Sequence, residues 1–465
     1  MSIFFAPRRI AGKIRNQARL LLKASSTLKA KNVLWQRRLL HDRTSRFLAQ
    51  SDQWKPETMV AWQLCQLNGL LQYALKNCPG HMRKLTAAGF DGKLERLEDL
   101  GMLPFFTKNE LRAQGDEFTA TNFPSNSLRA ITSGGTTGTP TRFMVEAKTY
   151  DALFDAWRHT MWRRAGYIPG KRCLDITWAF TDGRPLINSD KKNHVYLSIH
   201  DLDYGTLSTW WQRVKAFQPE FIIGFPSTAT ALAKLLPALG ALTEVRALLL
   251  ASETLTADQR AIIAAAFPHA RIFQWYGMSE MAGFASNCEY SDAFHHWPQS
   301  GIIEVIDDDG RPIQTAGQSG EIVLTGFINQ VTPFIRYRTG DRATLGDYCA
   351  KCGRMHKLLT NIEGRVGDFL LGERGRVVPI SALNFHGDEF RHVFAHQFIQ
   401  DEPGRVLLRI VPRLGFNNGD HSAINQLVSG ILGSDITFRI EQVEMIPRTP
   451  RGKQPLIIQR CSQNS

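Results

Sequence analysis

The feature that most constrains the fold is a regular alternation of extended and helical segments between residues 125 and 364. Runs rich in β-branched and aromatic residues alternate with runs in which apolar residues recur at i, i+3 and i+4. This order predicts βαβ units and an α/β fold built on a parallel sheet. The expected extended segments are 172–180, 221–227, 245–252 and 271–277, and the expected helices are 151–166, 207–217, 227–240 and 257–267.

Three loops follow strands of this expected sheet. Their sequences are GFPS from Gly224, ASET from Ala251 and YGMSE from Tyr276. Ligands of parallel sheets bind at the carboxyl ends of the strands, so we expect the three loops to converge there.

The expected sheet is the centre of a large domain, residues 51–364, in which mixed or parallel sheets are flanked by helices. Residues 59–114 are mostly helical in pattern, and short alternating strands over about 300–364 predict a β-rich subdomain. Residues 365–465 predict a small α+β domain. Its expected elements are a hairpin over 369–379, a helix, a strand at 405–412, a second helix and a strand at 438–447.

Positive charge is concentrated at the amino-terminal end. The chain has a formal net charge of +13, but residues 1–46 hold twelve basic residues and one acidic residue, which account for +11. The remaining residues carry only +2, which argues against a nucleic-acid partner. Residues 1–50 therefore read as a basic arm on a body of ordinary charge.

Apolar residues recur among the charges of this arm, from Phe4 and Phe5 to Leu39 and Leu40. The pattern is typical of amphipathic helices on anionic lipid and predicts peripheral contact with the inner membrane. It is equally typical of helices packed on the protein's own body. No apolar run reaches the roughly 18 to 20 residues of a membrane span, and seven scattered cysteines favour a reducing compartment, so we expect a cytoplasmic protein.

The segment from Ile131 to Val145 reads ITSGGTTGTPTRFMV and contains a loop of Ser, Thr and Gly. Glycines let a backbone approach a ligand closely, and hydroxyl groups bond phosphate oxygens, so the composition predicts a phosphate-binding loop. It lacks the Gly-Lys-Ser/Thr of a Walker A loop and the spacing of a dinucleotide GxGxxG. The alternative is a flexible surface linker.

Five motifs together resemble those of the adenylate-forming superfamily, which includes acyl- and aryl-CoA ligases, peptide-synthetase adenylation domains and luciferases. They occur in the family's order along nearly the whole chain after the arm. Upstream residues, with GFPS and ASET, resemble the phenylacetate-CoA ligase branch, whereas FLLGERGRVVP resembles proteins of capsule and exopolysaccharide biosynthesis. The five are TSGGTTGTPTRF at Thr132, YGMSE at Tyr276, YRTGD at Tyr337, GRVGDFL at Gly364 and PRTPRGK at Pro447.

The resemblance implies that Glu280 binds magnesium and that Asp341 holds both ribose hydroxyls. Lys453 would stabilise charge on the α-phosphate during adenylation, and Thr137 would belong to the catalytic loop around the departing phosphates. Asp368 would be the hinge of a mobile carboxyl-terminal domain. The remaining nucleotide contacts would be Ser133, Gly134, Gly135, Thr136, Gly138, Ser252, Glu253, Tyr276, Gly277, Ser279 and Arg365.

Each residue has a simpler explanation when taken singly. Asp341 suits a turn after Gly340, Glu280 suits a helix start, and Lys453 suits a solvated Pro/Gly-rich segment. In addition, Thr141 follows Pro140 where many members of the family have lysine. Only the joint pattern favours the catalytic interpretation.

The resemblance implies ATP-dependent activation of a carboxylic acid to an acyl-adenylate, followed by transfer to CoA. ATP, magnesium and CoA are the implied cofactors. One alternative acceptor is an amine of a sugar or amino acid, and one alternative function is a non-catalytic scaffold at the membrane. Aromatic residues before GFPS suit an aromatic or apolar acid but suit a protein core equally well.

Cysteine spacing adds a prediction of its own. Cys349 and Cys352 form a C-x-x-C knuckle flanked by glycines, and Cys288 precedes His295 and His296 by a few residues. Three thiolates and one imidazole, from His295 or His296, would make a closed structural zinc site. A redox-active or incidental C-x-x-C is the alternative. The resemblance to the phenylacetate branch implies that the two segments lie near one another.

Overall fold

The structure is a computed structural model, and its described residues fall into two compact units. The first comprises the described parts of Met1–Ile131, Arg142–Arg164 and Trp275–Glu363, and the second those of Thr132–Thr141, Ala165–Gln274 and Gly364–Ser465. The described residues are 33–90, 92–133, 141–178, 186–189, 193–198, 202, 204–255, 257–363, 369–379, 383, 388–390, 392–447 and 456–461.

Local capping signals set the helix boundaries of the first unit. Helix α3 starts at Pro56, whose fixed φ suits a first turn, and α4 starts at Pro79. Thr107 and Glu110 form a capping box before α5, in which each side chain accepts a hydrogen bond from the other's backbone N–H. The helical segments are α2 (Val33–Ser51), α3 (Pro56–Asn77), α4 (Pro79–Ala87), η1 (Leu97–Met102), α5 (Lys108–Gln114), η2 (Gly115–Phe118), η3 (Ser125–Ser127), α6 (Tyr150–Trp162) and η4 (Arg163–Ala165).

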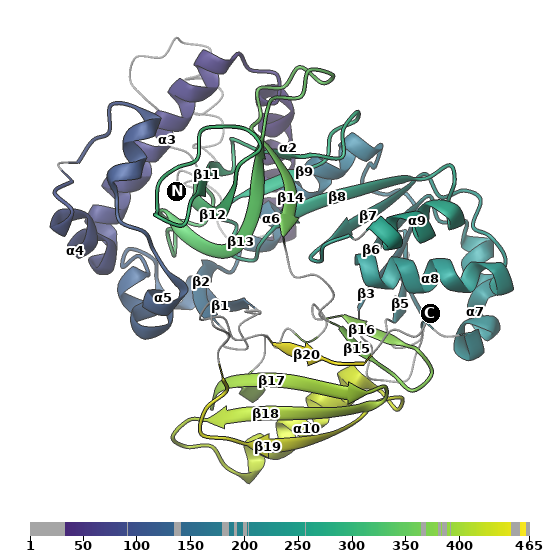
Figure 1. The fold of residues 1–465 in the computed structure, drawn as a ribbon. Helices are drawn as coiled ribbons and strands as arrows, with labels where there is room; N and C mark the ends of the chain where they lie inside the picture. Colours follow the sequence, from purple (N-terminus) through teal and green to yellow (C-terminus); the bar gives the residue numbers. More distant parts are fainter. Residues whose placement is uncertain are drawn as a thin grey trace. The chain divides into compact units, whose positions relative to one another are not determined.

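Antiparallel strands form the sheet of the first unit, in the order β11-β12-β13-β14-β10-β9-β8 (Figure 1). Apolar side chains from α5, β2 and β11 to β13 pack into one core, which includes Phe106, Phe143 and Leu324. The β-rich part expected over about 300–364 corresponds to β11 to β14. The strands are β1 (Leu128–Ser133), β2 (Thr141–Glu146), β8 (Arg271–Gly277), β9 (Phe284–Ser286), β10 (Phe294–His296), β11 (Gly301–Ile306), β12 (Ser319–Gly326), β13 (Tyr337–Gly346) and β14 (Leu358–Glu363).

Helix α2 forms the second part of the predicted basic arm, and it packs on the body of the first unit against α6. Leu48 is fully buried, and the Arg37 guanidinium donates to the carbonyl oxygens of Ala147 and Lys148, each over 3.2 Å. For this helix the packed alternative therefore applies. Residues 1–32 lie outside the described residues.

The second unit contains the parallel sheet expected from the sequence, with strands in the order β7-β6-β3-β5-β4. Strands β3, β5, β6 and β7 run parallel, and β4 adds an antiparallel edge strand that the sequence pattern did not predict. Gly224 lies where its Cβ would be 2.9 Å from the Ile176 side chain, so glycine permits this close packing. The elements are β3 (Cys173–Trp178), β4 (Leu186–Ser189), β5 (His194–Ser198), α7 (Tyr204–Phe217), β6 (Phe221–Gly224), α8 (Pro226–Leu239), β7 (Ala247–Ala251) and α9 (Ala257–Ala266).

The carboxyl-terminal part contains a four-stranded sheet in the order β19-β18-β17-β20, and α10 packs against it (Figure 1). The expected hairpin over 369–379 is present as β15 and β16. A helix was expected between the hairpin and residue 405, but residues 393–402 form the strand β17, whose largely buried backbone pairs with β18 and β20. The elements are β15 (Phe369–Leu371), β16 (Val377–Pro379), η7 (Asp388–Phe390), β17 (Val393–Glu402), β18 (Arg405–Pro412), α10 (Asn418–Leu432), β19 (Thr437–Gln442) and β20 (Ile457–Gln459).

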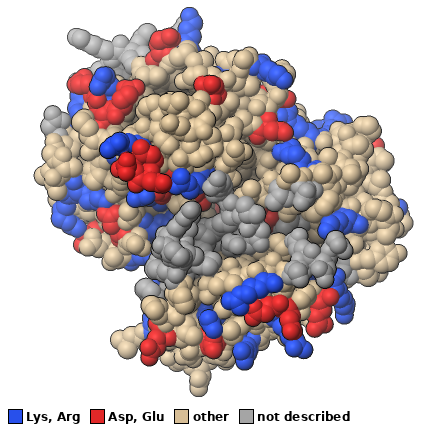
Figure 2. All heavy atoms as spheres, viewed as in Figure 1, with Lys and Arg blue, Asp and Glu red and all other residues tan. Residues whose placement is uncertain are grey.

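Charged side chains of both signs are interspersed over the face drawn in Figure 2. This agrees with the small net charge that the sequence carries outside the arm. Among the helices that the structure describes, none combines the length and apolar character needed to cross a bilayer.

Candidate active site

Tyr276 and Asp341, from two different motifs, meet in the first unit. Tyr276 lies near the end of β8 and Asp341 lies in β13, and the tyrosine hydroxyl donates to Oδ2 of Asp341 over 2.8 Å. Burial and the Asp341 carboxylate raise the pKa of Tyr276 well above its ordinary value, so the hydroxyl remains a donor. The bond orients the Asp341 carboxylate beside an aromatic ring.

Glu280 lies three residues after the end of β8 and is 3% exposed. The Tyr337 hydroxyl donates to its Oε1 over 3.1 Å. Within the described part of the chain, no lysine or arginine forms an ion pair with Glu280. A buried carboxylate is costly without a cation, and a hard divalent cation with oxygen ligands meets that need. The residue therefore fits the magnesium role implied by the resemblance.

Neighbouring elements hold the two motif loops in position. The Tyr150 hydroxyl, from α6, donates to the carbonyl oxygen of Ser279 over 2.9 Å. The Lys108 ammonium group, from α5, donates to the carbonyl oxygen of Thr339 in the YRTGD motif. Sequence analysis assigned no role to either side chain, because the contacts join residues far apart in the sequence.

Some motif residues have a structural explanation. Gly277 pairs with Phe284, and a Cβ on Gly277 would lie 2.6 Å from the Phe284 ring, so glycine allows β8 and β9 to pair. Arg338 of YRTGD forms an ion pair with Glu321, with an Nε to Oε2 distance of 2.9 Å. The nucleotide-contact role of Gly277 stays a prediction.

Ser252 and Glu253 lie in the second unit, directly after β7. This is the carboxyl end of a parallel strand, as the sequence predicted. Ser252 has φ of 70°, a left-handed conformation that is uncommon outside glycine and that clusters at functional sites. Their proposed place beside the adenine stays a prediction.

Several predicted site residues lie outside the described residues. They are Gly134, Gly135, Thr136, Thr137, Gly138, Arg365, Asp368 and Lys453, and the side chain of Ser133 is likewise not described. Their roles remain as the resemblance implies.

Two protein-family models match segments of the chain that contain some of these motifs. A family model described as AMP-binding enzyme matches residues 103–332, and one described as the CapK C-terminal domain matches residues 370–460. The chain belongs to the adenylate-forming superfamily. As a member, it is an AMP-forming ligase, and the residues around Glu280 and Asp341 form its candidate active site.

Curated relatives within this superfamily cover most of the chain. A phenylacetate-coenzyme A ligase of Thermus thermophilus is 29% identical over 336 residues, which are 70% of this chain and 74% of the relative. Protein CapK of Staphylococcus aureus is 24% identical over 412 residues, which are 83% of this chain and 86% of the relative.

A solved adenylate-forming structure matches the fold. It is a 2-hydroxyisobutyryl-CoA ligase in complex with 2-HIB-AMP and CoA, with a TM-score of 0.61 and 21% identity. The match covers 88% of this chain and 91% of that one. At this identity the match confirms the fold class.

The predicted zinc ligands also come together. Cys288, His295, Cys349 and Cys352 each offer a donor atom, and these atoms all lie within 4.8 Å of one another. His296 is not in this group, which decides between the two histidines left open by the sequence. Burial, followed by the nearby Arg164 guanidinium, lowers the pKa of His295 to about 3, so its imidazole is neutral.

Proposed function

We propose that this ligase activates a carboxylic acid with ATP and transfers the resulting acyl group to CoA. A carboxylate oxygen of the acid attacks the α-phosphorus of ATP, and the bond to pyrophosphate breaks. The CoA thiol then loses its proton and attacks the acyl carbon, and AMP leaves.

The observation that carries this proposal is the arrangement of two buried or half-buried carboxylates around β8. Glu280 and Asp341 each accept a hydrogen bond from a tyrosine hydroxyl. The Asp341 carboxylate would accept hydrogen bonds from ribose hydroxyls, and the flat Tyr276 ring would face the base. Glu280 would hold magnesium, which neutralises phosphate charge when two anions must meet.

The proposed acceptor follows from the relatives. The curated relatives with stated activity are phenylacetate-coenzyme A ligases, which supports CoA as the acceptor and an aromatic or apolar acid as the substrate. This substrate class agrees with the aromatic residues before GFPS.

A second candidate transfers the acyl group to an amine of a sugar or amino acid in capsule or exopolysaccharide biosynthesis. The specific observation that favours it is the match to the CapK C-terminal domain over residues 370–460. In adenylate-forming enzymes of the kind proposed here, this domain would approach the acceptor in the second half-reaction. A non-catalytic scaffold is disfavoured, because it would gain nothing from the unneutralised buried carboxylate of Glu280.

The test is a two-step assay with the full-length chain. A panel of carboxylic acids is first incubated with ATP and Mg²⁺, and acyl-AMP is measured by mass spectrometry. CoA, an amino sugar or an amino acid is then added in separate reactions. We expect an acyl-CoA thioester with stoichiometric AMP. An amide product without a thioester would favour the second candidate, and the absence of acyl-AMP with every acid would contradict both.

A further inference from the structure

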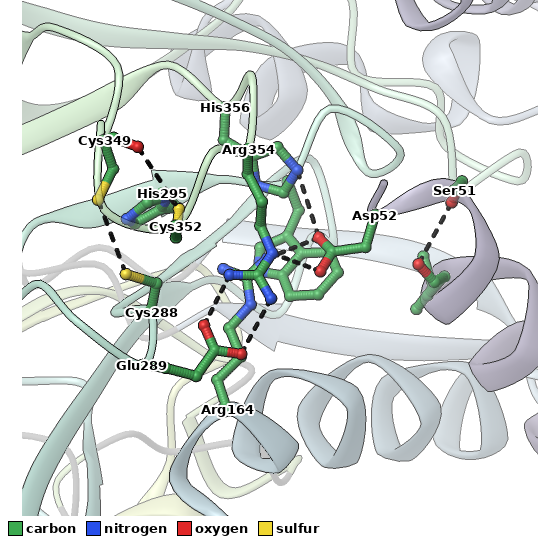
Figure 3. A network of polar contacts seen from close by, with 12 residues as sticks. Ser51, Asp52, Arg164, Cys288, Glu289, His295, Cys349, Cys352, Arg354 and His356 are labelled. Atoms are coloured by element: carbon green, nitrogen blue, oxygen red, sulfur yellow. Dashed lines mark hydrogen bonds and ion pairs between the residues drawn. The ribbon is translucent and has the colours of Figure 1, made fainter. Parts of the chain in front are cut away.

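Four potential metal ligands converge at one end of the β9–β10 hairpin. Cys288 lies two residues after β9, His295 lies in β10, and Cys349 and Cys352 lie in the loop between β13 and β14. Figure 3 shows the three sulfur atoms and the His295 ring turned toward one another. Segments that are separated by 61 residues in the sequence therefore supply one cluster.

The distances in this cluster suit a tetrahedral ion. With zinc–sulfur bonds of about 2.3 Å, two ligand sulfurs in a tetrahedral site lie about 3.8 Å apart. The Sγ atoms of Cys288 and Cys349 are 4.0 Å apart, and Cys352 Sγ lies 3.9 Å from His295 Nδ1. A disulfide needs a sulfur–sulfur distance of about 2.05 Å, so Cys288 and Cys349 are not bonded to each other.

Strand geometry explains why His295 and not His296 joins the cluster. Adjacent residues of a strand point to opposite faces of the sheet. Strand β10 pairs with β9 and with β14, and this pairing fixes its orientation, with His295 opposite Ser286 and Leu358. His296 is equally buried, at 3% exposure, but its ring lies on the other face. It is therefore a natural control for the role of His295.

The cluster is mostly buried, with Cys352 half-buried, and it has a backbone hydrogen-bond donor for a thiolate. Cys288 and His295 are fully buried and Cys349 is 8% exposed. The backbone N–H of Tyr290 donates to Cys288 Sγ over 3.3 Å, and such contacts orient and stabilise metal-bound thiolates. Close to the cysteine knuckle, Gly353 takes φ of 67° as its N–H bonds the Cys349 carbonyl oxygen, so glycine relieves strain in this turn.

An ion-pair network lies directly beside the cluster (Figure 3). Glu289 follows Cys288, Arg354 comes two residues after Cys352, and the two form a bidentate pair with distances of 2.6 and 2.9 Å. Arg354 Nε also donates to Asp52 over 2.6 Å, and Arg164 donates to the other oxygen of Asp52 over 2.7 Å. The same two loops that supply the metal ligands are thus joined a second time by charge.

We propose that Cys288, His295, Cys349 and Cys352 bind one Zn²⁺ ion in a closed structural site. Three thiolates and a neutral imidazole complete a tetrahedral shell, which leaves no position for a substrate. Three thiolates and Zn²⁺ carry a net charge of −1, and the site lies beside an ion-pair network in which two guanidinium groups balance two carboxylates. The ion fastens the β9–β10 hairpin to the loop between β13 and β14. This role is separate from acyl transfer and stands whether or not the proposed function is correct.

The test is metal analysis of the full-length chain purified without added metal. We expect one zinc per chain by plasma mass spectrometry. His295→Asn and Cys349→Ser should each lose the bound zinc, whereas His296→Asn and Cys78→Ser, a buried cysteine outside the cluster, should keep it. Zinc at the wild-type level in His295→Asn, or equal loss in His295→Asn and His296→Asn, would overturn the assignment.

A second measurement keeps the proposal testable if the variants do not fold. The wild-type chain is exchanged with Co²⁺, whose absorption reports coordination number and thiolate ligands. We expect the intense visible bands of tetrahedral Co²⁺ together with thiolate charge-transfer bands in the near ultraviolet. A metal-free wild-type chain, or a Cys288–Cys349 disulfide found by mass spectrometry without reductant, would refute the zinc site.

Discussion

At the scale of single residues, the candidate active site depends on tyrosine hydroxyls that position carboxylates. Tyr337 donates to Glu280 and Tyr276 donates to Asp341. Burial and the adjacent carboxylates raise the pKa values of both tyrosines, so neither hydroxyl ionises near neutral pH. A neutral donor fixes a carboxylate without cancelling its charge, whereas an arginine would. The two carboxylates therefore remain able to bind a cation and ribose hydroxyls.

One prediction at the scale of single residues concerns Lys453, which lies outside the described residues. Lys453→Ala should lose acyl-AMP formation by several orders of magnitude, because its charge would stabilise the α-phosphate only during adenylation. The variant should still convert supplied acyl-AMP and CoA to thioester. Lys234→Ala, which removes an exposed lysine of α8, serves as the control and should leave both steps unchanged. Equal losses in both half-reactions would contradict the assignment.

At the scale of elements, an ion-pair network of mostly buried side chains connects segments that lie far apart in the sequence. Asp52 follows α2, Arg164 lies in η4, and Arg354 lies between β13 and β14. The Asp52, Arg164 and Arg354 side chains are only 3% to 11% exposed. Arg164 also lies over the Trp297 ring, with its guanidinium carbon 3.9 Å from the ring centroid. The network therefore connects the end of α2 to the loops around the cysteine cluster.

Arg354→Ala should destabilise the first unit by about 1 to 3 kcal/mol, because Glu289, 35% exposed, loses its partner and Asp52 keeps its pair with Arg164. Arg311→Ala is the matched control, since Arg311 and Asp309 form an ion pair with side chains 78% and 73% exposed. It should change the free energy of unfolding by less than about 0.5 kcal/mol. Urea denaturation followed by tryptophan fluorescence measures both. Equal midpoints for the two variants would show that the network does not stabilise the fold.

Local sequence patterns predicted many of the strands and helices. They missed other strands and the ion pairs between distant segments, for physical reasons. Strands such as β7 and β8 were predicted because they are short segments rich in apolar and aromatic residues, and the C-x-x-C of Cys349 and Cys352 was visible as a short motif. The strand β17 was not predicted, because its buried residues include the polar His396, Gln397 and Gln400, so no apolar run marks it in the sequence. The pair of Asp52 and Arg354 spans 302 residues, and no local pattern marks either partner.

At the scale of the whole molecule, the five motifs identify the superfamily, whereas the substrate depends on side chains that no motif specifies. The positive charge of the chain lies mainly in residues 1–46. Part of that segment, helix α2, is committed to packing against α6. The residues before α2 hold eight of the twelve basic residues of the arm, so we expect them to dominate any binding to anionic lipid.

Binding to anionic vesicles tests that role. Full-length chain should sediment with the vesicles and dissociate as salt increases, since each basic residue near the membrane surface contributes about 1 kcal/mol. A chain that starts at Asn32 keeps α2 and should bind much more weakly. Equal sedimentation of the two chains would exclude the arm as a membrane anchor.

The most direct test of the central claim is carboxylate-dependent exchange of labelled pyrophosphate into ATP. The wild-type chain with Mg²⁺ should catalyse exchange only when its carboxylic acid is present. Glu280→Gln should lose exchange by at least about 100-fold, because the buried carboxylate would no longer hold the cation at the phosphates. Glu98→Gln, at an exposed position in η1, should exchange at the wild-type rate. Exchange by Glu280→Gln at the wild-type rate, or exchange that does not depend on any carboxylic acid, would contradict the account.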